Sequence, residues 1–180
     1  MLFRSLIFGS CQKNHQESTS AITFQLQTQN AGTGTVQWTS GTAHVATVTA
    51  ITPSATTSNY TSTVNQDINL FSPASIGNIT LPTGAYQNIQ FQLTMAPSAT
   101  TSALHLEGTF NDGTNTVPVK LDIPDNTVLQ VVDSSLAVAA GTGYKAIISI
   151  DLNKLTLGVA ATDLASTEQN GEVEDRKSVV

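Results

Sequence analysis

Charged residues are scarce in this chain: they make up 11% of its 180 residues, and only seven of them are lysine or arginine. The formal net charge of −6 argues against a nucleic-acid partner, because proteins that hold a phosphate backbone concentrate basic residues. The single cysteine, Cys11, excludes an internal disulfide framework. Helix surfaces usually carry glutamate and lysine pairs, so little charge beside abundant threonine and valine favours β-strands with wet outer faces.

What the chain does contain is a regular alternation of apolar and polar residues. The clearest example is the segment 79–95, where a strand ends at Leu81, Pro82 and Gly84 turn the chain, and a longer strand follows. This segment is predicted to be a hairpin with one buried face, and the polar residues of the longer strand are predicted to face outward. The apolar residues predicted to be buried in the longer strand are Ile89, Phe91, Leu93 and Met95.

The same alternation recurs from Ala21 onward, with turn signals between the segments. Residues 21–174 are therefore predicted to form one all-β domain, an antiparallel β-sandwich of about nine strands. Segment 155–164 is ambiguous between a loop and a short helix. The other predicted strands lie within 22–26, 36–51, 60–71, 104–110, 117–123, 128–132 and 144–152, with a further one beginning at Glu172.

Several local signals refine this prediction. Ser40-Gly41 interrupts an apolar run, which predicts a bulge or a strand that switches sheets. Segment 111–115 contains Asp-Gly and predicts a tight hairpin turn. Pro118 and Pro124 face the same way, and two prolines on one face predict an edge strand, where a missing N–H group costs nothing.

No residue pattern predicts catalysis, a cofactor or a metal. The three histidines, His15, His44 and His105, are far apart and lack metal-ligand spacing, and the last two are predicted to point outward. Segment 111–115 lacks the downstream glutamate of a calcium loop, so the turn interpretation is favoured. Gly141-Thr142-Gly143 is too short to hold a phosphate and opens a strand. No serine or cysteine lies in a nucleophile elbow, and we expect no enzyme activity.

Both termini look foreign to the domain. Met1–Ser5 resembles a start codon followed by translated sequencing adapter, and 175–180 resembles the same adapter read from the other strand. Ordinary polar tails are the alternative. Without Arg4, Asp175, Arg176 and Lys177 the chain keeps 4 of 7 basic and 12 of 13 acidic residues, a net charge of −8. We therefore expect the domain to be truncated at its C-terminus.

The run from Leu6 to Cys11 is apolar and then places Gly9 and Ser10 directly before the cysteine. It resembles a bacterial lipobox, in which small residues give access to the cleavage point and the thiol carries diacylglycerol. This resemblance implies that 1–20 are a truncated signal peptide, a lipobox and a flexible tether, with lipid attached at Cys11. Phe8 departs from the leucine usual at that position, and the charged start of a signal is missing. The alternative is a buried apolar strand with an unused thiol.

A family resemblance rests on Pro82-Thr83-Gly84-Ala85-Tyr86, with alternating Ile89-Gln90-Phe91 after it and Asp67-Ile68-Asn69-Leu70 before it. It is similar to a pattern of bacterial envelope lipoproteins with immunoglobulin- or transthyretin-like domains of unknown function, broadly similar to fimbrillin-type surface proteins. The resemblance spans roughly 21–164. It implies an Ig- or transthyretin-like sandwich and an outer-membrane lipoprotein, periplasmic or surface-exposed, and it transfers no active site.

The resulting functional hypothesis is a non-enzymatic envelope lipoprotein that serves in adhesion, surface assembly or an accessory role. A β-sandwich that binds carbohydrate or peptide through an exposed aromatic residue, Trp38 or Tyr60, is the alternative. A lone tryptophan in a strand is more often core than a ligand platform. Two or more aromatics in a surface groove would favour the binding module, whereas a long exposed strand edge would favour assembly.

Overall fold

The computed structural model describes residues 18–29, 36–53, 58–111, 113–156, 168–169 and 172–175. These residues form eleven strands and one short 3₁₀ helix, so the predicted all-β class is confirmed. Nine of the strands are eight residues or longer, in agreement with the number expected. The elements are β1 (Thr19–Gln29), β2 (Val36–Thr52), β3 (Ser58–Asn69), β4 (Ala74–Pro82), β5 (Gly84–Met95), β6 (Leu104–Asn111), β7 (Thr116–Ile123), β8 (Thr127–Val138), β9 (Tyr144–Asp151), η1 (Leu152–Thr156), β10 (Glu168–Gln169) and β11 (Glu172–Asp175).

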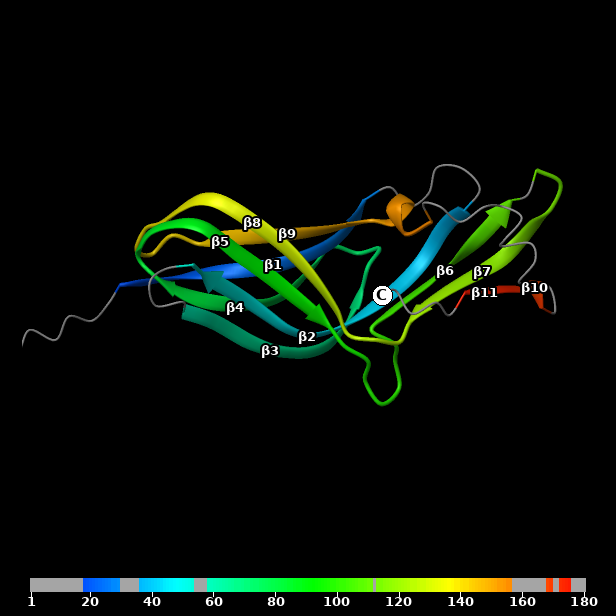
Figure 1. Cartoon of the computed structure of the whole chain (residues 1–180), viewed down its shortest axis with the longest axis horizontal. Coiled ribbons are helices and arrows are strands. Elements are labelled where there is room, and N and C mark those ends of the chain that lie inside the picture. Colours follow the sequence, from blue (N-terminus) through cyan, green and yellow to red (C-terminus); the bar gives the residue numbers. More distant parts are fainter. Residues whose placement is uncertain are drawn as a thin grey trace, which may run out of the picture.

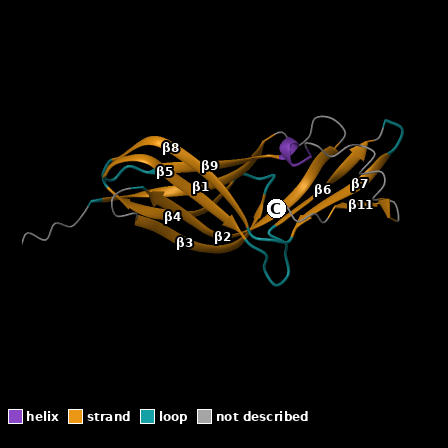
Figure 2. Cartoon of the chain, in the orientation of Figure 1, coloured by secondary structure: helices purple, strands orange, loops and turns teal. Residues whose placement is uncertain are grey.

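The strands form two sheets that pack into an open sandwich (Figure 1). The smaller sheet has the order β4-β1-β9, and the larger one has the order β10-β11-β7-β6-β2-β5-β8, with β3 paired to β2. Most neighbours are antiparallel, but β1 pairs with β9 and β7 pairs with β11 in parallel. Strands dominate the drawing in Figure 2, where the described loops are short apart from the one below the centre.

Strand β2 is the central strand of the larger sheet and runs the length of the molecule (Figure 1). Its first half, Val36–Ala43, pairs with β6, and its second half pairs with β5 along the same edge, while β3 occupies the opposite edge. The register shifts between Trp38 and Ser40, which confirms the predicted bulge. Gly108 of β6 fits this bulge because a Cβ atom there would collide with the backbone carbonyl of Gln37.

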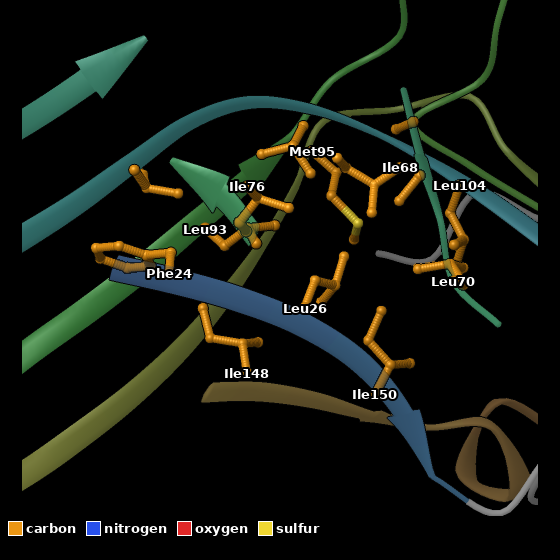
Figure 3. Close-up of a cluster of buried hydrophobic side chains, with 14 of the residues drawn as sticks. Phe24, Leu26, Ile68, Leu70, Ile76, Leu93, Met95, Leu104, Ile148 and Ile150 are labelled. Carbon is orange, nitrogen blue, oxygen red and sulfur yellow. The ribbon is translucent and has the colours of Figure 1, made fainter. Parts of the chain in front are cut away.

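The core lies between the two sheets, where the alternation of the sequence placed it. All four residues predicted to be buried in β5 are at most 6% exposed, and the glutamines between them are half-buried. The rings of Phe24 and Phe91 meet edge to face with centroids 5.8 Å apart. Figure 3 shows Phe24 and Leu26 of β1 gathered with Leu93 and Met95 of β5, and Ile148 and Ile150 of β9 beside them.

The predicted hairpin at 79–95 is wrong, because β4 and β5 belong to different sheets. Strand β4 pairs with β1, whereas β5 pairs with β2 and β8. Thr83 is the residue between the two strands, and its N–H donates to the carbonyl of Ser18 (2.8 Å), which holds the crossing. Alternation predicts which residues are buried, but it does not say which strand is the hydrogen-bonded neighbour.

The edge-strand interpretation of β7 is wrong for part of its length. Val119–Leu121 pair with Val173–Asp175 of β11 on the side away from β6. Pro118 precedes this pairing, so its missing N–H does not oppose it. The strand predicted to begin at Glu172 is present, and Asp175, assigned above to a foreign tail, is its last residue.

The structure describes all or part of three further segments considered in the sequence analysis. The hairpin turn at 111–115 is confirmed by the pairing of Asn111 with Thr116 and by Gly113, whose φ is 93°; Asp112 lies outside the described residues. The strand predicted at 128–132 extends to Val138. Of the ambiguous segment 155–164, residues 155–156 belong to η1, and 157–164 lie outside the described residues.

Candidate functional site

Two histidine–carboxylate pairs lie at the centre of the molecule, where β2 passes from β6 to β5. In the first pair, His44 Nδ1 lies 2.6 Å from Asp67 Oδ1, and His44 Nε2 lies 3.2 Å from Asn65 Oδ1. His44 lies opposite the exposed Asp67, on the outward face predicted for it, but it is only 7% exposed. The loop between β5 and β6 covers it: the His44 N–H donates to Ala103 O (3.0 Å), and its carbonyl accepts from the N–H of Ala96 (3.1 Å).

The second pair joins neighbouring strands of the larger sheet. His105 of β6 lies opposite Asp122 of β7, with Nδ1 2.8 Å from Asp122 Oδ1, and its Nε2 lies 3.4 Å from Glu107 Oε1. The side chain of His105 is 34% exposed, so this histidine does reach the surface. Asp67 of the first pair and both residues of the second line a cleft of about 480 Å³, which we call the waist cleft.

The hydroxyl groups of the waist cleft are held by carboxylates and not by histidines. Thr101 donates to Asp67 (3.2 Å), and Ser102 donates to Asp122 (3.1 Å). Each carboxylate therefore fixes the orientation of one hydroxyl beside the cleft. Among the described residues, no group of three or more histidine, cysteine, aspartate and glutamate side chains could hold a metal ion. These hydrogen bonds form what we call the polar brace: Thr101 and Ser102 join the loop to β3 and β7, and the two histidines join β2 to β3 and β6 to β7.

The carboxylates raise the pKa of both histidines. For His44 the largest cause is the hydrogen bond to Asp67, which burial partly opposes and the hydrogen bond to Asn65 and the charge of Asp67 reinforce. For His105 burial is the largest single cause and lowers the pKa, but the hydrogen bonds to Asp122 and Glu107 and their charges together outweigh it. Both imidazoliums are thus favoured by folding.

We predict that this brace makes the protein more stable below neutral pH. A histidine pKa that is raised on folding contributes stability that is complete below the unfolded value of 6.5 and is lost as pH rises through the folded pKa. The free energy of unfolding in urea should therefore fall from about pH 6 to pH 8. A His44→Gln, His105→Gln double variant should show a flatter profile, and an unchanged slope in that variant would contradict this origin.

A second cleft, of about 520 Å³, opens between the sheets at the end of the sandwich where β1 begins, the left end in Figure 1. We call it the mouth cleft. Tyr60 of β3 and Tyr86 of β5 line it, both half-buried against the edge of the core. Tyr86 Oη donates to the carbonyl of Pro82 (2.7 Å). Trp38, the other aromatic considered from the sequence, is 5% exposed and belongs to the core.

The third feature is the outer edge of β8. This strand ends the larger sheet, and among the described strands only β5 pairs with it. The side chain of Asp133 accepts a hydrogen bond from the backbone N–H of Ser135 (3.0 Å), so this N–H already has a partner. We therefore count the free edge only as far as the residue before Asp133. We call Thr127–Val132 the free β8 edge. The large apolar side chains that are exposed in the described part of the chain are Val128, Val131 and Val132 of β8 and Ile147 of β9.

Comparison with protein-family models, with curated proteins and with solved structures finds no match to this chain. In the ranges that the structure describes, no helix has the length and apolar character needed to cross a membrane. Cys11 and His15 lie outside those ranges. The His44–Asp67 pair was not predicted from the sequence, because the two residues lie on different strands, β2 and β3, and their register is not evident from the sequence. A bulge beside His44, between Val45 and Thr47, also disturbs the alternation there.

Proposed function

We propose that this chain is a non-enzymatic lipoprotein of the bacterial cell envelope whose sandwich assembles with a second copy through the free β8 edge. The observation that carries the proposal is the outer side of Thr127–Val132, which pairs with β5 on its inner side and with no other described strand, together with the exposed valines on this segment. The lipobox-like run before Cys11 supports the anchor, and the envelope-lipoprotein resemblance supports the location.

An unpaired strand edge is a ready template for another strand, because its N–H and C=O groups lack partners. Proteins that avoid such pairing place lysine, proline or a bulge on the edge. The free β8 edge carries none of these, and its register with β5 is regular throughout. The outer edge of β3, on the other side of β2 from β5, is less suitable for pairing. Its exposed face is mostly polar, and Asn65 has a positive φ of 50°.

A second copy is the partner that the edge fits best. Two identical edges related by a two-fold axis meet antiparallel, and each supplies the same groups to the other. The chain carries a net charge of −6, so two copies repel each other through most of their surface. Thr127–Val132 contains no charged residue, so the contact brings no like charges together.

The test is a lysine on the free edge. Wild-type protein is expected to sediment as a concentration-dependent dimer, and Val132→Lys, which places two ammonium groups in the contact, should weaken the dimer at least about tenfold. Val132 is 53% exposed, so the variant should keep its melting temperature. Asn59→Lys, at an exposed position of β3, is the matched control and should remain dimeric. A monomeric wild type, or a Val132→Lys protein that dimerises equally well, would refute the assembly.

A further inference from the structure

We infer that the mouth cleft binds a neutral saccharide, with Tyr60 and Tyr86 as the platforms for the sugar ring. This site is independent of the free β8 edge and of any lipid anchor. Its volume of about 520 Å³ lies within the range of small-molecule sites. It would add ligand recognition to a domain whose proposed assembly uses another strand.

The charge of the cleft defines the class of ligand. The chain is acidic overall, yet none of the described residues that line the mouth cleft is charged. A charged ligand would be desolvated there without an opposite charge to compensate it. Hydroxyl and amide side chains line the cleft instead, from Ser18, Thr52, Ser58, Thr83 and Gln87. The ligand that suits this lining is polar and uncharged.

The two tyrosines select a sugar from among polar, uncharged ligands. A pyranose has an apolar face of C–H groups and a rim of hydroxyls, so it needs an aromatic surface and hydrogen-bonding groups together. Tyr60 and Tyr86 come from β3 and β5, the two strands that flank the second half of β2. A peptide with a free terminus would instead need a group that receives its charge, and the described residues of the mouth cleft lining provide no charged group.

Hydrogen bonds within the chain hold the walls of the cleft, which reduces the entropic cost of binding. The hydroxyl of Tyr86 is fixed on Pro82 O at 2.7 Å, so its ring has little freedom. Thr83 is tied through its N–H to Ser18 O at 2.8 Å, and the buried hydroxyl of Thr52 donates to Ser58 O at 3.2 Å. These contacts tie the start of β1 to the crossing from β4 to β5, and they close the β2–β3 hairpin at the other wall of the cleft.

The experiment is a screen of the full chain on an array of neutral oligosaccharides, followed by NMR titration with each sugar that is retained and with an acetylated, amidated tripeptide. We expect at least one neutral sugar to shift the amide signals of Thr83, Ala85 and Gln87. Tyr60→Ala should weaken that binding at least about tenfold. Tyr60→Phe, which keeps the ring, should retain most of it.

Gln92→Ala, on β5 but outside the cleft, is the matched control and should bind as wild type. The inference is overturned if no neutral sugar binds, if the tripeptide binds and the sugars do not, or if Tyr60→Ala binds a retained sugar unchanged. Sedimentation of Tyr60→Ala separates the two proposals. A variant that loses the sugar and still dimerises leaves the assembly intact, and a wild type that binds sugar as a monomer refutes the assembly alone.

Discussion

Replacing Phe91 by alanine is expected to lower the free energy of unfolding by about 3–5 kcal/mol. Phe91 is 6% exposed and packs its ring edge to face on Phe24, with centroids 5.8 Å apart and an interplanar angle of 76°. The strands that carry the two rings belong to different sheets, so the substitution opens a cavity in the contact between layers. Urea unfolding of the wild type and the variant measures the difference.

Gln90→Ala is the control for this prediction. Gln90 is the sequence neighbour of Phe91 and lies on the other face of β5, so its loss should change stability by no more than about 0.5 kcal/mol. Gln92 is a less clean control because its side chain donates to Gln130 Oε1 at 3.0 Å. A larger loss for Gln90→Ala than for Phe91→Ala would show that the faces of β5 are assigned in reverse.

The second large effect concerns the anchor. With a gene that supplies a complete signal peptide, the protein expressed in a bacterium should partition into the detergent phase, and Cys11→Ala should move it almost wholly to the aqueous phase. The physical reason is that acyl chains attached at Cys11 contribute about 0.8 kcal/mol per buried CH₂ group, and two or more chains hold a protein stably on a membrane.

Ser10→Ala is the matched control for the anchor, because it keeps a small side chain before the cysteine and should partition like the wild type. Equal partition of the wild type and Cys11→Ala would contradict lipid attachment at Cys11. The sandwich would then reach the envelope by another route, and the assembly through β8 would be unaffected.

The layer structure was predictable from the sequence because it depends on alternation. The residues that point inward from β1, β5 and β6 follow a period of two, and burial follows the same period. Pairing depends on which edges meet in space, so the relation of β4 to β5 was predicted wrongly. The parallel partner of β7 comes from 172–175, far along the chain, and no local signal near Pro118 announces it.

The candidate sites were less predictable, for related reasons. Tyr60 was recognised as a candidate aromatic, but Tyr86, which completes the mouth cleft, lies on another strand. His44 was predicted to face outward, and it does share a face with Asp67, but its burial beside the loop before β6 was not predicted. The open side of β8 was not predicted, since a run of valines reads the same in a central strand and in an edge strand. Each of these features depends on tertiary contacts between distant segments.

The most direct test of the assembly is hydrogen exchange along β8, measured at low and high protein concentration. Strand addition by a second copy gives partners to backbone N–H groups that otherwise face solvent. The amides of Thr127–Val132 that point away from β5 should therefore become more protected as concentration rises, while those beyond Asp133 stay unchanged, and Val132→Lys should abolish the effect. Protection of this segment that does not depend on concentration would contradict assembly through the free β8 edge.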